Sequence, residues 1–426
     1  MNENRRRFLT LVGASSVGWL AGCGGDDVGE DESPNPPQQI TTLTPGAESG
    51  TQDFGESVAL SSDSSTIVVS DSRREYDTGA AYVFERSGDD WRSQQRLIPA
   101  DAERGSNVAE SLAISDDGRT VVVGAPSIGG ADETPTERNG SAYVFERSDG
   151  RWDRQAKLTA EADSEDLFGI STAISGDSST LLIADPGRNA DAGVAYVFEQ
   201  SNESWNRRAT LTADDGDDQD RFGTGLSISE DGSTIVIGAP GVESPDVTGT
   251  GAAYVFGKID REWSQQTKLV ADENSVGRHG SAVAISSDGR TVIVGADHVG
   301  DSREGIAGFV SVFEQSDEEW NQTATFAPEA DGNGSIGSLT VSDDGGTIAL
   351  GAPDGSPGET SGSAFLFEQS EREWRQQATV TPQDSDTQTI FGWSVAVSGD
   401  GTTTLVGAPN GSPPERGGSG EVYVFQ

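Results

Sequence analysis

The densest group of side chains that could do chemistry is an acidic run at positions 214–220, with five carboxylates in seven residues. The run leads directly into Phe222. Carboxylate oxygens are the ligands that Ca²⁺ prefers in proteins, so part of the run is a candidate calcium site: Asp214, Asp217, Asp218 and Asp220. A solvated acidic loop is the alternative explanation, because carboxylates are abundant throughout the chain.

The two histidines, His279 and His298, are the second candidate centre. A histidine pair could hold a metal ion or serve as acid and base. Related segments of the chain carry Phe and Pro at those places, so drift from a repeated pattern is the alternative. The chain contains no nucleophile elbow, phosphate-binding loop or H-E-x-x-H motif. We therefore expect no catalytic residues.

The elements that must position these side chains belong to a cassette written seven times, at a period of about 56 residues. Each copy has a short apolar stretch, a polar turn, a second apolar run such as 120–126, a third run such as 79–85, and a polar stretch led by Trp. The copies begin at Phe54, Val108, Phe168, Phe222, His279, Ser335 and Phe391.

The cassette predicts four strands per copy. Its runs are short, β-branched or aromatic, and bounded by Gly, Asp, Ser and Pro, with almost no helical period. Seven such copies predict an all-β fold, a seven-bladed β-propeller of four-stranded blades over residues 38–426. Gln426 ends a third strand, and residues 38–45 resemble the fourth strand at 376–382. We expect this N-terminal strand to complete the last blade and close the ring, leaving no free sheet edge.

Two short motifs recur in the cassette. Phe-Gly begins the first strand, as at Phe54 and Phe168, and Gly-Ala-Pro ends the second, as at 124–126 and 238–240. These motifs resemble the FG-GAP repeat, a family that includes the ligand-binding head of integrin α chains. The resemblance implies a binding role and, in many members, a calcium loop of the D-x-D-x-D-G kind. Here those turns keep only Asp-Gly, as in 115–120, which predicts a plain hairpin turn.

The connections between second and third strands vary most in length and sequence, as in 127–139, 241–250, 354–361 and 410–418. Binding residues concentrate on variable loops held by a rigid scaffold. Two of these segments carry the N-glycosylation acceptors that we consider best placed, Asn139 and Asn410. The repeated Trp occupies one place in each copy, which is typical of packing rather than recognition.

The charge balance indicates the environment. The formal net charge is −43, from 71 acidic and 28 basic residues. Acidity spread over every repeat is typical of a protein that works in molar salt, where a Debye length of about 3 Å screens self-repulsion. We therefore expect a halophilic source. The regular strand pattern excludes a disordered chain, and the missing basic footprint argues against nucleic-acid binding.

The first 23 residues are predicted to be an export signal. Arg5, Arg6, Phe8 and Leu9 resemble the twin-arginine motif. Cys23, the only cysteine, follows a lipobox-like Leu-Ala-Gly and is the expected site of lipid attachment. Residues 24–37 are rich in Gly, Asp, Glu and Pro and would form a flexible tether. The expected location is the extracellular face of the cytoplasmic membrane, with the lipid as the only membrane contact.

Together these features predict a monomeric, lipid-anchored surface protein that binds an envelope protein or a glycan through variable loops on one face, with Ca²⁺ as a candidate ion. One alternative is an extracellular propeller enzyme of the glycosidase, lyase or quinone-dependent dehydrogenase type. The innermost strands disfavour it, because they carry no acid or base between Ser57 and Ser61 or at equivalent places. The other alternative is a passive structural lipoprotein.

Overall fold

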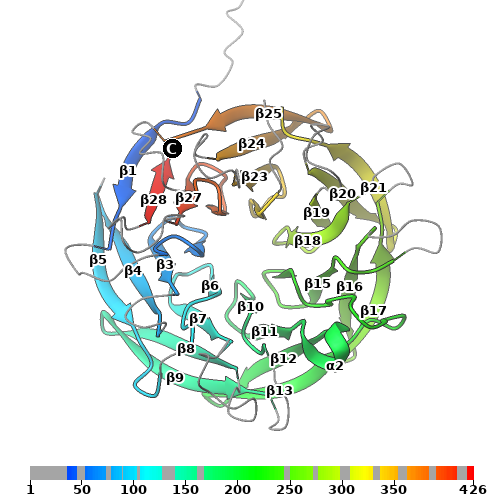
Figure 1. The fold of residues 1–426 in the computed structure, drawn as a ribbon, viewed down its shortest axis with the longest axis horizontal. Helices are drawn as coiled ribbons and strands as arrows, with labels where there is room; N and C mark the ends of the chain where they lie inside the picture. The colour runs from blue at the N-terminus through cyan, green and yellow to red at the C-terminus, as the bar shows by residue number, and fades with distance from the viewer. Residues whose placement is uncertain are drawn as a thin grey trace, which may run out of the picture. The chain divides into compact units, whose positions relative to one another are not determined.

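The computed structural model of the protein describes residues 36–45, 53–72, 78–88, 90–102, 106–126, 140–160, 167–243, 250–271, 277–297, 308–329, 336–353, 362–382, 390–409 and 420–426. Residues 36–426 form one compact unit. Within it, seven four-stranded antiparallel sheets stand around a central axis (Figure 1). The predicted seven-bladed β-propeller is confirmed.

In the first six blades the strands follow the chain outward, from the axis to the rim. Blades 1 to 3 comprise β2 (Val58–Leu60), β3 (Thr66–Asp71), β4 (Ala80–Ser87) and β5 (Asp90–Leu97); β6 (Leu112–Ile114), β7 (Thr120–Ala125), β8 (Ser141–Ser148) and β9 (Arg151–Thr159); β10 (Ser171–Ile174), β11 (Thr180–Asp185), β12 (Val194–Ser201) and β13 (Ser204–Leu211).

Blades 4 to 6 are built in the same way, and the last blade draws on both ends of the compact unit. Blades 4 to 7 comprise β14 (Leu226–Ile228), β15 (Thr234–Ala239), β16 (Ala252–Ile259) and β17 (Glu262–Leu269); β18 (Arg278–Ile285), β19 (Thr291–Asp297), β20 (Phe309–Ser316) and β21 (Glu319–Phe326); β22 (Ser338–Val341), β23 (Thr347–Ala352), β24 (Ser363–Ser370) and β25 (Glu373–Val380); β26 (Ser394–Val397), β27 (Thr404–Ala408), β28 (Glu421–Phe425) and β1 (Gln39–Leu43). One short helical element, α2 (Arg188–Asp191), is described outside the sheets.

The hydrophobic core lies between neighbouring blades. Second strands such as β7 are buried throughout, whereas fourth strands such as β17 alternate between exposed and half-buried residues and form the rim. One cluster joins Val68 and Val83 of blade 1 to Val121 and Tyr143 of blade 2. The repeated Trp packs into these clusters in six blades, as predicted for an architectural residue: Trp91, Trp152, Trp205, Trp263, Trp320 and Trp374.

Ring closure follows the sequence prediction. Strand β1 pairs with β28, and β2 of blade 1 contacts β26 and β27 of blade 7. The pairing skips Ile40, forming a bulge where the other fourth strands also have one, such as at Arg208 in β13. Reciprocal backbone hydrogen bonds of 2.7 and 3.0 Å join Gln38 to Gln426. The N-terminal strand is therefore the missing fourth strand of the last blade.

The Phe-Gly and Gly-Ala-Pro motifs meet at the seam between blades. A Cβ on Gly124 would lie 2.1 Å from the carbonyl oxygen of Gly169 in the next blade. A Cβ on Gly140 would lie 2.1 Å from the carbonyl oxygen of Phe168. Real Cβ atoms do not approach oxygen this closely, so only glycine permits the contact. The motif glycines thus set the distance between blades.

The hairpin turns between first and second strands are closed by Ser and Asp. In blade 2 the Ser115 hydroxyl donates to Asp117 Oδ1 at 2.7 Å, and the Arg119 N–H donates to the same oxygen at 3.0 Å. Gly118 supplies the left-handed backbone, with φ of 64°. The Ser–Asp hydrogen bond occurs in all seven blades, and Ser64 and Ser178 take the left-handed place of glycine in blades 1 and 3. The predicted hairpin turns are present.

Two details of the predicted register were wrong. The sixth copy begins at Ile336 rather than Ser335: Ile336 is 1% exposed, and the next N–H, of Gly337, donates to Gly351 across the sheet. This blade is one residue shorter before its hairpin. In the fifth copy the place of Pro belongs to Asp297, because Ala296 pairs with Phe309 as Ala239 pairs with Ala252. His298 lies outside the described residues.

His279 occupies the place of the motif Phe and is fully buried. Its ring stacks on Phe309, with centroids 6.1 Å apart, and meets Phe313 edge-on at 6.0 Å. Neither ring nitrogen has a hydrogen-bond partner within the described part of the chain. Burial lowers the pKa of His279 to about 3, so the ring stays neutral at ordinary pH. His279 is therefore a core residue that has diverged from the repeated Phe, which was the alternative explanation offered by the sequence.

We predict that His279→Phe stabilises the protein, because the variant removes two buried, unsatisfied nitrogens at a net gain of about 1–3 kcal/mol. The pKa of His279 is near 3 when the protein is folded and near 6.5 when it is unfolded. Protonation of this residue therefore lowers the stability of the wild type, but not of the variant, as the pH falls through this window. The gap should widen by about 1.4 kcal/mol per pH unit. Denaturant unfolding from pH 8 to pH 4 measures it. Phe222→His is the mirror control, and a pH-independent gap would contradict the assignment.

Candidate functional site

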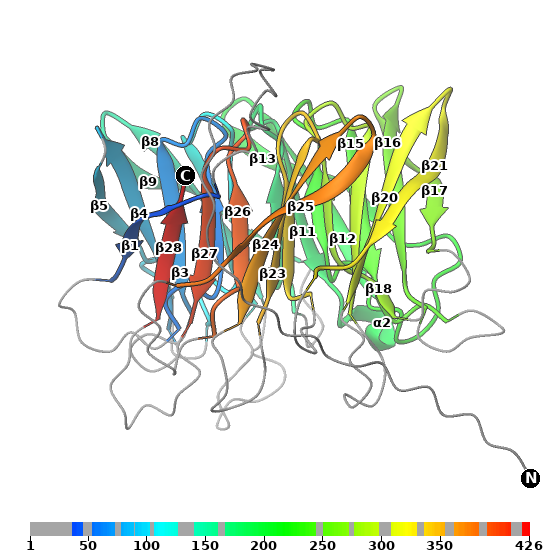
Figure 2. The ribbon, with the colours of Figure 1, turned by 90° about the horizontal axis from the view of Figure 1, so that it is seen from above.

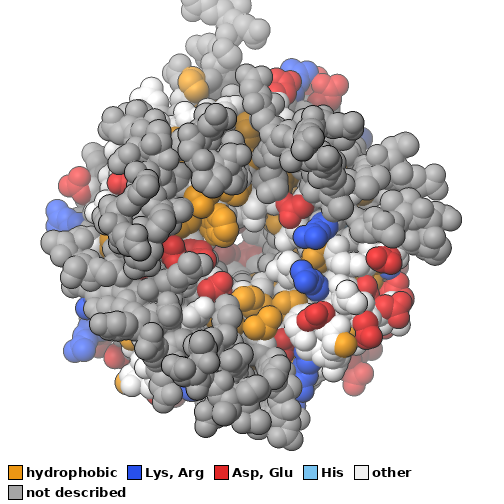
Figure 3. Space-filling view, in the orientation of Figure 1, with side chains coloured by type: hydrophobic (Ala, Val, Ile, Leu, Met, Phe, Trp, Pro, Cys, Tyr) orange, Lys and Arg blue, Asp and Glu red, His pale blue; other side chains and the backbone are white. Residues whose placement is uncertain are grey.

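The blade topology sorts the connections onto two faces. The hairpins within each blade lie on one face, and the second-to-third-strand and blade-to-blade connections lie on the other, here called the loop face (Figure 2). Figure 3 views the loop face, where acidic and basic side chains lie side by side to the right of the central hollow. This is the face on which the sequence places variable loops.

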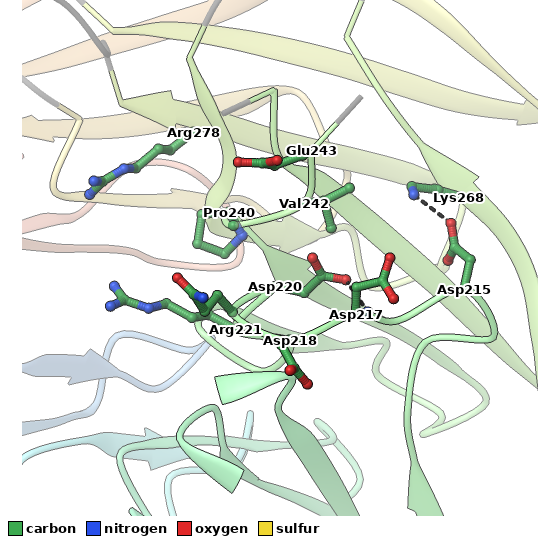
Figure 4. A pocket seen from close by; sticks show the side chains of 12 residues that line it. Asp215, Asp217, Asp218, Asp220, Arg221, Pro240, Val242, Glu243, Lys268 and Arg278 are labelled. Carbon is green, nitrogen blue, oxygen red and sulfur yellow. Dashed lines mark hydrogen bonds and ion pairs between the residues drawn. The ribbon is translucent and has the colours of Figure 1, made fainter. Parts of the chain in front are cut away.

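A cavity of about 620 Å³ opens on the loop face at blade 4. Two connections and two strands contribute its walls: the β13–β14 connection, the β15–β16 connection, the end of β17 and the start of β18 (Figure 4). The charged lining comprises Asp215, Asp217, Asp218, Asp220, Arg221, Glu243, Lys268 and Arg278. The cavity therefore includes most of the acidic run together with three basic side chains.

A close backbone contact holds the two main connections together. The Gly241 N–H donates to the Asp220 carbonyl at 3.0 Å, and a Cβ on Gly241 would lie 1.9 Å from the Gln219 carbonyl oxygen. The next residue, Val242, is 5% exposed and belongs to the core between blades 3 and 4. The cavity wall is thus anchored to the scaffold by glycine and by an apolar residue.

One end of the cavity is neutralised internally. Lys268 Nζ lies 2.6 Å from Asp215 Oδ2, and the Tyr254 hydroxyl donates to Asp215 Oδ1 at 3.0 Å. Burial acts to raise the pKa of Asp215, but the Lys268 and Tyr254 hydrogen bonds bring it below its ordinary value. Asp215 therefore stays ionised and its charge is matched by Lys268.

The middle of the cavity carries carboxylates without such a match. Asp220 is 5% exposed, and its Oδ2 accepts the Asp217 N–H at 2.8 Å. Burial raises the pKa of Asp220, and the charge of Asp217 adds to this effect. In Figure 4 the carboxyl groups of Asp217 and Asp220 lie next to each other, with Glu243 above them. This part of the cavity would gain from a bound cation or hydrogen-bond donor.

The opposite end carries two guanidinium groups. Arg221 and Arg278 both line the cavity, and both run to the side away from Lys268 (Figure 4). Both residues are exposed. Arg278 pairs in register with Asp297, whose pKa is raised by burial and lowered to a smaller extent by the Arg278 charge. The cavity is therefore bipolar, with cations at one end and unmatched carboxylates in the middle.

The structure brings together only part of the predicted calcium set. Asp217 and Asp220 are neighbours, whereas the Asp218 side chain points away from them (Figure 4). Asp214 is exposed and its N–H donates to Gln265 at 3.0 Å. Among the described residues, no three acidic, His or Cys side chains form a metal-binding group. Calcium binding by Asp214, Asp217, Asp218 and Asp220 stays a prediction.

Several other predicted sites lie outside the described residues. They are Arg5, Arg6, Phe8, Leu9 and Cys23 of the export and lipid signals, and the glycosylation acceptors Asn139 and Asn410. In the part of the chain that is described, no helix is long and apolar enough to cross a bilayer.

Backbone strain gathers beside the cavity. Gln219 and Arg221 have φ of 72° and 55°, and three consecutive residues of α2, at 189–191, are also left-handed. The two segments are joined by hydrogen bonds from Gln219 N–H to Ala190 O at 3.1 Å and from Arg221 N–H to Asp191 O at 2.7 Å. Such strain costs about 1–2 kcal/mol per residue, and it fixes the direction in which Arg221 leaves the backbone.

Comparison with protein families identifies the repeat. The model of the FG-GAP repeat matches residues 91–145, 152–198, 205–256 and 374–425. The chain carries FG-GAP repeats. Each match runs from the Trp of a fourth strand to the Phe of the next third strand, so the FG-GAP unit is offset by one strand from a blade. No curated protein sequence matches the chain.

Registering the FG-GAP repeats exposes residues that sequence reasoning missed. Trp393 is 42% exposed and precedes the innermost strand β26, at a place held by Glu56, Ile170 and Thr224 in other blades. Arg221 and Arg278 were also missed, although each directly precedes the motif Phe position. The sequence did contain a signal that could have identified these residues. The repeated Trp was assigned to packing because it recurs in the copies, and by the same criterion a recognition residue should differ from its equivalents in the other copies.

A second acidic group lies on the hairpin face. The turns there are joined around the axis by backbone hydrogen bonds, such as Asp116 N–H to Gly176 O at 3.3 Å and Asp343 N–H to Gly399 O at 3.0 Å. Burial raises the pKa of Asp116 to about 6, with further contributions from the charges of Asp343 and Glu230 in other blades. Carboxylates from blades 2, 4 and 6 therefore lie close enough on the hairpin face to interact.

We predict that Asp116→Asn stabilises the protein above pH 6, where the wild-type carboxylate must ionise against its neighbours. Because the pKa of Asp116 is raised to about 6 in the folded state, the gain should shrink as the pH falls and vanish below the unfolded pKa of about 4. Added salt should also reduce it. Thermal unfolding at pH 3.5, 5 and 7.5 tests this.

Asp117→Asn is the matched control at the adjacent residue. Asp117 accepts the Ser115 hydroxyl and the Arg119 N–H inside the turn, so its replacement should destabilise at neutral pH by about 0.5–1.5 kcal/mol. Equal effects of the two variants would contradict the roles assigned to these neighbours.

Proposed function

We propose that the protein is a binding propeller that recognises its ligand through the loop face. The observation that supports this proposal is the bipolar cavity at blade 4, where two connections and two strand ends meet on a scaffold fixed by glycine contacts. Cavities of a few hundred Å³ with converging polar groups are typical of ligand sites. The FG-GAP repeats are consistent with a binding or adhesion role, which is an argument from fold alone.

We further propose that this binding takes place at the cell surface, with an envelope protein or a glycan as partner. Support comes from the sequence: the twin-arginine-like signal at residues 5–9, the lipobox-like Cys23 and the acidic composition suited to molar salt. A lipid on Cys23 would hold a monomer at the extracellular face of the membrane.

A second candidate function is an enzyme at the hairpin face. It is favoured by Asp116, whose raised pKa near 6 and charged neighbours Glu230 and Asp343 are features of catalytic carboxylates. We rank it below binding, because a buried like-charge group raises pKa values in purely structural settings as well. A glycosidase and dehydrogenase activity screen of wild type and Asp116→Asn separates the two.

The test of the binding function is a pull-down at multi-molar salt against solubilised envelope proteins and glycans, with and without a calcium chelator. The bait is the full chain with Cys23→Ser, so that no lipid is attached. We expect a saturable partner that is lost with the loop-face double variant Arg221→Gln, Arg278→Gln. The hairpin-face double variant Arg119→Gln, Arg290→Gln is the charge-matched control and should retain the partner.

Either of two outcomes would count against loop-face recognition: no saturable partner, or a partner held equally by both double variants. Loss of the partner on chelation would support the calcium prediction for Asp217 and Asp220, whereas binding that is insensitive to the chelator would remove calcium from the interaction.

A further inference from the structure

The repeat register singles out two arginines. Six described residues directly precede the motif Phe position, and only in blades 4 and 5 is that residue basic: Asp53, Asn107, Leu167, Arg221, Arg278 and Ile390. Blades 4 and 5 are neighbours. The register therefore delivers two guanidinium groups, 57 positions apart in the chain, to one cavity.

These arginines differ from the third basic residue that lines the cavity. Lys268 is paired with Asp215 at 2.6 Å. No ion pair involves Arg221 or Arg278 among the described residues. Acidic residues outnumber basic ones by 71 to 28, so the chain has many carboxylates with which an arginine could form an ion pair. Asp297 lies opposite Arg278 in the sheet without forming an ion pair with it. Guanidinium forks that form no ion pair are suited to an anionic group of a ligand.

The carboxylates of the same cavity would be stabilised by a positively charged group. Asp215 is neutralised by Lys268, which leaves Asp217, Asp220 and Glu243 beside the arginine end. Burying Asp220 raises its pKa, because an ionised carboxylate without a cation is costly to bury. A cationic or amine donor placed between Asp217 and Asp220 would relieve that cost and their mutual repulsion.

We propose that this cavity binds a zwitterion, with the carboxylate of the ligand on Arg221 and Arg278 and its amine at Asp217 and Asp220. This inference rests on the loop-face binding function proposed above and names the ligand chemistry. A purely anionic ligand would leave the three carboxylates unmatched, and a purely cationic one would leave the arginines unmatched. None of the described residues that line the cavity is aromatic, so the described walls lack the stacking surface usual for a neutral sugar ring.

The size of the cavity suits a small molecule or a short chain segment. Its volume of about 620 Å³ lies inside the range of small-ligand sites. The wall that carries both charges is fixed by the Gly241 contact and by the strained backbone at Arg221. Charge spacing is therefore a property of the free protein, and ligands should be selected by the distance between their own charges.

The test is calorimetric titration of the full chain carrying Cys23→Ser with a ladder of zwitterions: glycine, glycylglycine, 4-aminobutanoate and 6-aminohexanoate. The matched single-charge probes are butylamine and butanoate, and glucose, glucuronate and CaCl₂ represent the other ligand classes. We expect one zwitterion to bind at least about tenfold more tightly than either single-charge probe, since each charge-assisted contact contributes about a factor of ten or more.

Variants assign the two ends. Arg221→Gln with Arg278→Gln should weaken the preferred zwitterion and butanoate by about tenfold to a hundredfold and leave butylamine unchanged. Asp217→Asn should weaken the zwitterion and butylamine but not butanoate. Arg290→Gln, on the hairpin face, is the control and should change nothing. Circular dichroism and the unfolding temperature establish that each variant is folded.

Three results would overturn the proposal: no zwitterion binds, butanoate or glucuronate binds as tightly as the best zwitterion, or glucose or CaCl₂ binds best. The pull-down separates this failure from failure of the binding function. A partner lost with the arginine double variant, without zwitterion binding, leaves loop-face recognition standing and removes the zwitterion. Zwitterion binding without an envelope partner leaves a small-molecule site and removes envelope recognition. Failure of both experiments removes both.

Discussion

The whole ring depends on backbone-to-backbone contact between neighbouring blades. Where Gly124 meets the Gly169 carbonyl, and Gly140 meets the Phe168 carbonyl, there is no room for a Cβ atom. The Phe-Gly and Gly-Ala-Pro motifs are therefore two sides of one seam, and each blade specifies the position of the next. Because seven seams must close a circle, and the N-terminal strand β1 completes the last blade, a change in one seam is passed around the ring.

A seam this tight leaves the connections as the place where the repeats can differ. The hairpin turns are held by the same Ser–Asp pair in every blade, so that face repeats itself. The loop face carries the departures: Arg221 and Arg278 before the motif position, Asp297 in place of Pro, and Trp393 before an innermost strand. A scaffold that fixes the strands converts single-residue departures into fixed positions in space, which is the condition for a selective site.

Sequence periodicity was sufficient to predict the fold, because each strand, turn and seam glycine occurs in several copies. An ambiguous copy can therefore be interpreted by comparison with the others. Periodicity failed where one copy departs alone. The missing residue between Ile336 and the hairpin turn was invisible to a fixed spacing, and only the burial of Ile336 and the Gly337 hydrogen bond reveal it. The acidic half of the candidate site was visible as a run at 214–220, whereas the arginine half was not. Arg221 and Arg278 become neighbours only when adjacent blades are placed side by side.

The two kinds of departure differ in what surrounds them. His279 replaces a core Phe, and the neighbouring Phe309 and Phe313 rings provide no hydrogen-bond partner for its nitrogens. The replacement therefore costs stability and no new interaction in the described part of the chain offsets it. Arg221 and Arg278 are exposed where the other described copies have a buried or half-buried residue, and both line one cavity. In a protein with so large an acidic excess, nearby carboxylates would readily capture a free guanidinium group. Neither arginine forms an ion pair within the described part of the chain, although Asp297 lies opposite Arg278 in the sheet. A partner outside the chain explains their position at one cavity better than drift does.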